Sequence, residues 1–216
     1  MKKTFTIFLI MVLMMSLAAC GGQDDSGTQD KQAGESYTIT DMLGREVEIP
    51  ADVNTIAAVN SAARFITYAG AADKLVGVTD LDKKGEPGMP YAYVNRESFA
   101  DLASTGSGGS EDTTYAEELV TLAPDLIFAY TSDTAALDEL SRQTGIPVVG
   151  LYATDMFAED FLGSLTLVGS VMGTEEQADK VAEAIRGWQK DLSDRTKDIA
   201  EEDKPTVYMG GMGYRG

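Results

Sequence analysis

The residues best suited to contact a small molecule follow short apolar segments that the sequence predicts to be strands. Asn60 and Ser61 come directly after one such segment, and Arg64 lies in the first turn of the helix predicted to follow. Tyr130 and Tyr152 end two further apolar segments. Ligands of parallel sheets bind beyond the carboxyl ends of the strands, near helix N-termini. We expect Arg64 to meet an anionic group and the tyrosines to border a partly polar cleft, while plain helix capping is the other role open to Ser61.

A second candidate group falls within residues 80–114, a stretch without a strong period and rich in Gly, Pro and Ser. It holds cations and aromatic rings that we expect to form a positive rim facing the ligand: Lys83, Lys84, Tyr91, Tyr93 and Arg96. Lysines in a solvated loop are the simpler alternative. A loop of this length in a compact domain is either functional or hides an element that the pattern does not reveal.

Catalytic chemistry has little support in the composition. The chain has 216 residues, no histidine and one cysteine, so Ser-His-Asp and Cys-His arrangements and histidine metal sites are excluded within it. Its carboxylate pairs lie in tails or on predicted helix surfaces. The net charge of −18 repels phosphates, which argues against nucleic acid as a partner. We expect no enzyme, no metal site and no cofactor.

The N-terminus has the pattern of an export signal. Lys2 and Lys3 precede the apolar run 5–19, which ends in Leu-Ala-Ala before Cys20. As a helix this run would span about 24 Å, short of a hydrocarbon core of about 30 Å. Cys20 is placed as in the bacterial lipobox, which predicts lipidation at this residue. Residues 21–36 contain almost nothing to bury and read as a flexible tether.

Strands and helices alternate through the rest of the chain, which predicts an α/β lobe with a mainly parallel sheet. A hairpin is expected over 37–49, and a long amphipathic helix from Thr174 to about Ala200. Residues 204–209 read as a further strand that begins a second lobe. Because the chain stops soon after, at Gly216, we expect most of that second lobe to be missing. Gly210, Gly211, Tyr214 and Arg215 would face the cleft from it.

Two segments resemble one known family. Ile39 to Pro50, Ile-Thr-Asp-Met-Leu-Gly-Arg-Glu-Val-Glu-Ile-Pro, is similar to its opening hairpin, and Glu117 to Phe128 is similar to its Glu-x-Ile-x-x-Leu-x-Pro-Asp-Leu-Ile segment. The chain thus resembles the iron-siderophore and cobalamin substrate-binding proteins of ABC importers. The resemblance implies two Rossmann-like lobes joined by a backbone helix, with the ligand between them. It also implies that Glu117 docks on the permease.

The function implied is that of an extracytoplasmic lipoprotein, anchored to the cell membrane through its lipid. It would capture a ferric siderophore-like chelate or a cobalamin-like ligand and deliver it to a permease and its ATPase. A ligand-sensing lipoprotein that signals to a membrane receptor, and an extracytoplasmic α/β enzyme, are the alternatives. The expected organisation is a signal peptide (1–19), a tether (20–36), a ligand-binding lobe (37–172), an inter-lobe helix (173–203) and the start of a second lobe (204–216).

Overall fold

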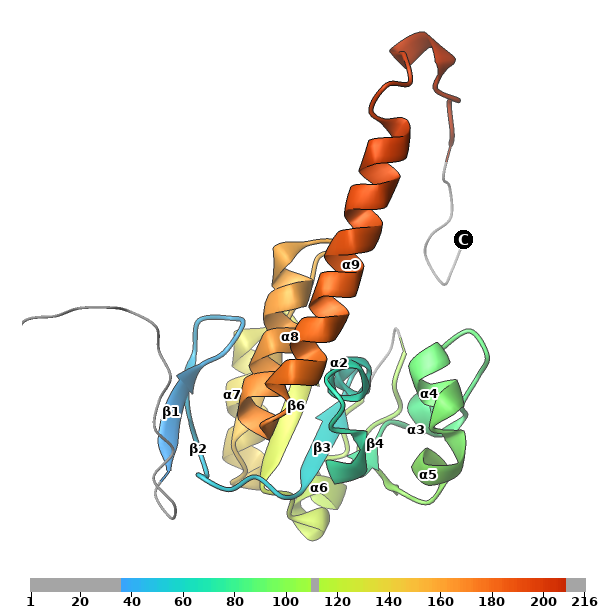
Figure 1. The fold of residues 1–216 in the computed structure, drawn as a ribbon. Coiled ribbons are helices and arrows are strands. Elements are labelled where there is room, and N and C mark those ends of the chain that lie inside the picture. Colours follow the sequence, from blue (N-terminus) through green and yellow to red (C-terminus); the bar gives the residue numbers. More distant parts are fainter. Residues whose placement is uncertain (1–35, 110–112, 209–216) are drawn as a thin grey trace, which may run out of the picture. The chain divides into compact units, whose positions relative to one another are not determined.

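The computed structural model describes residues 36–109 and 113–208 (Figure 1). Their central feature is a parallel sheet of five strands in the order β5-β4-β3-β6-β7. These strands are β3 (Ile56–Val59), β4 (Leu75–Val78), β5 (Ala103–Ser104), β6 (Leu126–Tyr130) and β7 (Val148–Leu151). The strands β3 and β7 are buried along their whole length, as expected for a parallel sheet covered on both faces. The prediction of an α/β lobe with a mainly parallel sheet is confirmed.

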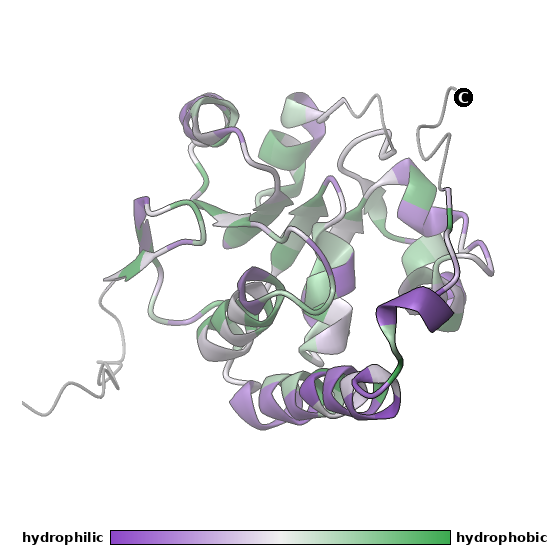
Figure 2. Cartoon of the chain, turned by 90° about the horizontal axis from the view of Figure 1, so that it is seen from above, coloured by the Kyte–Doolittle hydropathy of each residue, from purple (hydrophilic) through white to green (hydrophobic). Residues whose placement is uncertain are grey.

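The two faces of the sheet pack into separate apolar clusters, because successive side chains of a strand point to opposite sides. In β3, Ala58 belongs to the cluster that contains α2 (Ala62–Tyr68), α8 (Glu159–Met172) and α9 (Glu175–Thr196). Ala57 and Val59 belong to the other cluster, with α6 (Ala116–Leu122) and α7 (Thr134–Thr144). Figure 2 shows the resulting hydrophobic centre of strands between more polar helices.

The N-terminal hairpin pairs β1 (Tyr37–Thr40) with β2 (Glu46–Ile49) and is fixed to the sheet through its turn. The buried carboxylate of Asp41 accepts hydrogen bonds from the backbone amides of Leu43, Arg45 and Gly150, at 2.9–3.0 Å. It also forms an ion pair of 2.8 Å with the Arg45 guanidinium. A Cβ at Gly150 would lie 2.9 Å from this carboxylate and 2.5 Å from Leu43. The Asp-Met-Leu-Gly-Arg turn therefore fixes the hairpin to the edge strand β7.

Residues 80–114 contain regular elements that the sequence analysis did not predict. They are α3 (Asp80–Lys83), α4 (Pro90–Val94), α5 (Arg96–Ala100) and β5. Thr79 starts α3 with a capping box, since its hydroxyl accepts from the amide of Asp82 while the Asp82 carboxylate accepts from the amide of Thr79. Helices of four or five residues are too short to establish a helical period, so the pattern gives no signal for them.

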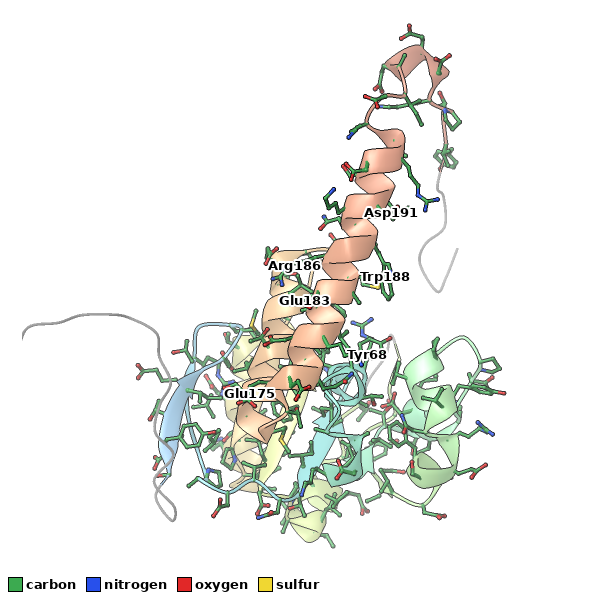
Figure 3. The ribbon with its side chains drawn as sticks, in the orientation of Figure 1. Tyr68, Glu175, Glu183, Arg186, Trp188 and Asp191 are labelled. Atoms are coloured by element: carbon green, nitrogen blue, oxygen red, sulfur yellow. The ribbon has the colours of Figure 1, made fainter. Side chains whose placement is uncertain are left out.

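The long helix is present as α9, a continuous helix of 22 residues that ends at Thr196, earlier than predicted. Ala178, Ala182 and Ile185 are buried against the lobe. The same stripe continues at Trp188 and Leu192, but these are 57% and 53% exposed. Figure 3 shows Trp188 on the part of α9 that follows this packed segment, with charged Glu183, Arg186 and Asp191 along the helix.

The prediction of a strand over 204–209 is wrong for the residues of this range that the structure describes. Glu201–Asp203 form a 3-10 helix called η3, and residues 205–208 are exposed and adopt no regular structure. A strand is stabilised by hydrogen bonds to a neighbouring strand, and no described strand pairs with this segment. The glycine-rich residues from Gly210 onward lie outside the described part of the chain, as do the apolar run 5–19 and Cys20.

Candidate ligand-binding site

The strand order places a crevice between the carboxyl ends of β3 and β6. From β3 the chain continues to β4 on one side, and from β6 it continues to β7 on the other side. Ligands of doubly wound sheets bind at such a topological switch point. Asn60 follows β3 with a positive φ of 57°, and its side-chain amide donates to the carbonyl of Tyr130 at 3.1 Å. Asn60 therefore ties the two strand ends together across the crevice.

Arg64 lies next to Tyr130, at the carboxyl end of β6. It lies in the first turn of α2, and its guanidinium carbon is 5.0 Å, 5.5 Å and 5.7 Å from the ring centroids of Phe65, Phe161 and Tyr130. Aromatic faces stabilise a cation at this distance. The Arg64 Nε is buried and has no hydrogen-bond partner in the described structure, and none of the ion pairs found there involves Arg64. A buried donor without a partner is costly, and an acceptor that entered from solvent could satisfy it.

A cavity of about 190 Å³ opens at Arg64. Its lining combines one cation, one carboxylate, several hydroxyl groups and apolar side chains. The lining residues are Arg64, Tyr68, Tyr130, Ala153, Thr154, Asp155, Met156 and Phe161. The cavity fits a small anionic group or one polar edge of a larger ligand.

The loop between β7 and α8, residues 152–158, forms one wall of this cavity and is held by side chains. The Tyr130 hydroxyl donates to the carbonyl of Ala153 at 2.8 Å. Ser164, buried in α8, accepts from the amide of Tyr152 at 3.0 Å and donates to its carbonyl at 2.6 Å. The amide of Thr154 donates to Asp160 at 3.0 Å. The wall is therefore positioned before any ligand arrives.

The structure brings together two of the predicted ligand residues, Arg64 and Tyr130, in this cavity. Asn60 and Ser61 are not among its lining residues. Ser61 occupies the position before α2, but its side chain makes no capping hydrogen bond. Tyr152 is also absent from the lining, and its backbone is clamped by Ser164.

Among the predicted rim residues, Arg96 contacts the exposed Tyr93, while Tyr91 and Lys83 form hydrogen bonds within the lobe. The Tyr91 hydroxyl is buried and donates to Asp82 at 2.7 Å, while its ring packs edge-on against Tyr68. Burial and the neighbouring Asp82 carboxylate raise the pKa of Tyr91. Lys83 donates to the carbonyl of Leu102 at 2.7 Å and so ties α3 to the segment before β5. Tyr91 in α4 is buried and Lys83 in α3 is half-buried, so both side chains are engaged within the lobe, and their predicted place in a positive rim stays a prediction.

Tyr68 and Asp155 line the cavity, but the sequence analysis did not single them out. A signal for Tyr68 was available, because it lies four residues after Arg64 and thus on the same face of a helix. Asp155 lies in a loop after β7, where no sequence pattern indicates the direction of a side chain.

Glu117 is exposed in the first turn of α6, next to Glu118. Leu119 is the buried residue of this helix, and Val120 is 49% exposed. A carboxylate on this surface is accessible to a partner, and its predicted role in docking stays a prediction.

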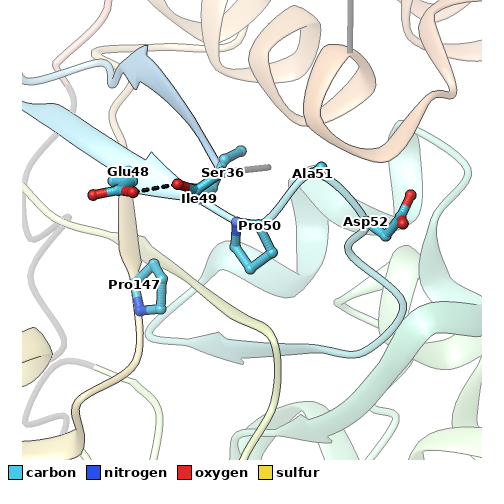
Figure 4. Close-up of a pocket in the computed structure, with 7 residues that line it drawn as sticks. All are labelled: Ser36, Glu48, Ile49, Pro50, Ala51, Asp52 and Pro147. Carbon is cyan, nitrogen blue, oxygen red and sulfur yellow. Dashed lines mark hydrogen bonds between the residues drawn. The ribbon is translucent and has the colours of Figure 1, made fainter. Parts of the chain in front are cut away.

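Other hollows are less suited to an anionic ligand. Figure 4 shows a cavity of about 510 Å³ lined by Ser36, Glu48, Pro50, Asp52 and Pro147 among others. It lies by the end of β2 and the start of β7, away from the carboxyl edge of the sheet, and carries two carboxylates and no cation. A third cavity of about 250 Å³ lies between α6 and α7 and contains Asn60 and Thr131. Its only charged residue is Glu139, which is paired with Arg142.

No helix among the described residues is long and apolar enough to cross a membrane. Within 36–109 and 113–208, no cluster of Cys, Asp and Glu side chains has the arrangement of a metal site.

Comparison with known proteins agrees with this fold. Residues 56–216 match the periplasmic binding protein family, and the chain belongs to that family. It is 27% identical to an uncharacterized ABC transporter substrate-binding lipoprotein of Bacillus subtilis, YvrC, over 97% of this chain and 64% of the relative. It is 25% identical to the iron(3+)-hydroxamate-binding protein FhuD of the same organism, over 99% of this chain and 65% of FhuD. The chain thus spans just under two thirds of the length of each.

A solved structure shows the same fold. The molybdate-binding protein MolA of Haemophilus influenzae superposes with a TM-score of 0.64 at 20% identity, over 77% of this chain and 56% of MolA. The resemblance to the periplasmic binding proteins is therefore confirmed in both sequence and fold.

Proposed function

We propose that this chain is the ligand-capturing lobe of an extracytoplasmic substrate-binding lipoprotein of an ABC importer. Its ligand is a metal chelate of the ferric siderophore type or a cobalamin-like compound, which it delivers to a permease driven by an ATPase. The observation that carries the proposal is the unpaired guanidinium of Arg64, held by aromatic rings at the switch point of the sheet. Chelates of this type present negatively charged oxygens, which an arginine binds through charge-assisted hydrogen bonds.

The relatives support this proposal in two ways. One carries the name of a substrate-binding lipoprotein and the other that of an iron(3+)-hydroxamate-binding protein. The cavity of about 190 Å³ would hold one polar edge of a chelate. A facing lobe, as in the family, would cover the remainder.

The ligand proposal is tested by replacing Arg64 with Gln and titrating the purified chain with a ferric hydroxamate. We expect the affinity to fall about 10- to 100-fold, the cost of losing a charge-assisted hydrogen bond to a ligand. Arg142→Gln removes the same charge from an exposed ion pair on α7 and is the matched control. Equal affinities of the two variants would refute the role of Arg64.

The transport proposal is tested separately in cells. Replacing Glu117 with Arg should reduce uptake of the chelate while leaving its binding to the purified protein intact. Glu118→Arg is the matched control on the same helix turn. The lipid anchor is tested by labelling with a lipid analogue, which we expect on the wild type and not on Cys20→Ala.

A further inference from the structure

Arg64 and Asp155 line the same cavity with opposite charges and do not pair with each other. Both are among the eight residues that surround about 190 Å³. No ion pair within 4.0 Å joins them in the described structure. A ligand group that fills the space between them would face a hydrogen-bond donor on one side and an acceptor on the other.

The remaining polar groups add acceptors to the Asp155 side. The hydrogen of the Tyr130 hydroxyl is used by the carbonyl of Ala153, so its oxygen offers only lone pairs to a ligand. Asp160 lies behind the loop, where one carboxylate oxygen binds the amide of Thr154 and the other is buried without a partner in the described structure. Asp160 does not itself line the cavity. The acceptors in the lining are Asp155 and the Tyr130 oxygen, and its donors are Arg64 and the hydroxyl groups of Tyr68 and Thr154, which can also accept.

We infer that Asp155 is a specificity determinant that selects ligands carrying an N–H or O–H donor next to an anionic oxygen and that excludes donor-free oxyanions. This inference rests on the proposed function, because it concerns the same cavity. An oxyanion such as molybdate has only acceptors, so it would meet Arg64 favourably and be repelled by Asp155. A hydroxamate chelate built on a peptide satisfies both sides, with its oxygens at Arg64 and an amide N–H at Asp155.

The isosteric variant Asp155→Asn separates this role from folding. Asp155 Oδ1 accepts from the amide of Phe157 at 2.7 Å, and an asparagine side chain retains that acceptor while adding a donor. Asp179→Asn removes the same charge from an exposed position of α9 that lines none of the cavities described above, and it is the matched control. Asp155→Glu keeps the charge and should keep the selectivity.

The purified full chain and its variants would be titrated with molybdate and, separately, with a ferric trihydroxamate peptide, with binding followed by NMR or calorimetry. We expect Asp155→Asn to bind molybdate at least tenfold more tightly than either the wild type or Asp179→Asn, and to bind the ferric peptide several-fold more weakly. Asp155→Asn that binds molybdate no better than Asp179→Asn would overturn the inference. Failure of every variant to bind the ferric peptide would instead count against the proposed ligand class, and the molybdate titration would still decide the role of Asp155.

Discussion

Two arginines of this lobe lie in opposite environments. Arg45, with 15% of its side chain exposed, pairs with buried Asp41, donates to the carbonyl of Val148 at 3.2 Å and reaches Asp138 at 2.9 Å. Arg64 lies over three aromatic rings with its Nε buried and unpaired within the described residues. The first arginine has its partners within the fold, whereas the Nε of the second has none among the described residues. Under the proposed function, this difference separates a residue that stabilises the lobe from one that binds the ligand.

The largest loss of stability is expected when Asp41, the buried partner of Arg45, is removed. Asp41→Ala removes four hydrogen-bond acceptor contacts and leaves Arg45 without its buried partner, which should lower the free energy of unfolding by about 3–5 kcal/mol. Urea denaturation measures this change. Asp138→Ala, which removes the exposed partner of Arg45, should cost about 1 kcal/mol or less and serves as the control. Similar losses in the free energy of unfolding for both variants would show that Asp41 does not fix the hairpin to the sheet.

Little change in stability is expected when Arg64 is replaced. Arg64→Gln should change the free energy of unfolding by about 1 kcal/mol or less, because the lost contacts with the aromatic rings are offset by the removal of a buried donor that has no partner among the described residues. Thermal and urea denaturation without ligand provide the measurement. A loss of 2 kcal/mol or more would mean that the aromatic contacts of Arg64 serve stability, and the comparison of the two arginines would fail.

A loss smaller than that of Asp41→Ala is expected at Tyr91, whose buried hydroxyl donates to Asp82. Tyr91→Phe should cost about 1–3 kcal/mol, since it leaves the Asp82 carboxylate with one donor fewer. Because the pKa of Tyr91 is raised in the folded state, its contribution is complete below the unfolded pKa of about 10 and is lost as the pH rises above it. Between about pH 8 and 11, on either side of that pKa, the free energy of unfolding should therefore fall less steeply with pH for Tyr91→Phe than for the wild type. A slope identical to that of the wild type would contradict this.

Among the carboxylates that the fold holds by hydrogen bonds, the smallest effect is expected at Asp125, which is more accessible to solvent than Asp41 or Asp82. Burial by itself raises its pKa, but the amides of Thr55 and Asn54 and the hydroxyl of Thr55 outweigh burial and hold the pKa below the usual value. Its contribution is therefore present above the unfolded pKa of about 4 and is lost as the pH falls through the lower folded value. Acid unfolding should shift only slightly in Asp125→Asn. An acid-unfolding midpoint identical to that of the wild type would mean that these hydrogen bonds do not hold the pKa of Asp125 down.

The sequence predicted elements well where a period or a terminal residue is strong. The predicted hairpin, parallel sheet and long helix are all present. Tyr130, predicted to end an apolar strand, is the last residue of β6. Prediction failed within residues 80–114, where the capping box at Thr79 and proline at the start of α4 mark helices too short to show a period.

The candidate site was predicted only in part. The ends of the strands indicate which residues lie near the site, but they do not indicate where the side chains of these residues point. Arg64 and Tyr130 were identified from the rule that ligands lie at the carboxyl edge of the sheet. The same rule selected Tyr152, whose backbone the structure instead clamps to Ser164. Tyr91 and Lys83 were assigned to a rim because their segment read as a loop, and α3 and α4 place them in internal contacts instead.

By itself the sequence determined the parallel sheet and the long helix, since continuous apolar segments and a helical stripe encode them locally. It also determined that histidine chemistry has no place in this chain. Only the tertiary structure decided which arginine is satisfied and which is not. That distinction depends on which carboxylates and carbonyls lie within about 3 Å of each guanidinium, and residues as distant in sequence as Arg45 and Val148 meet only after the chain has folded.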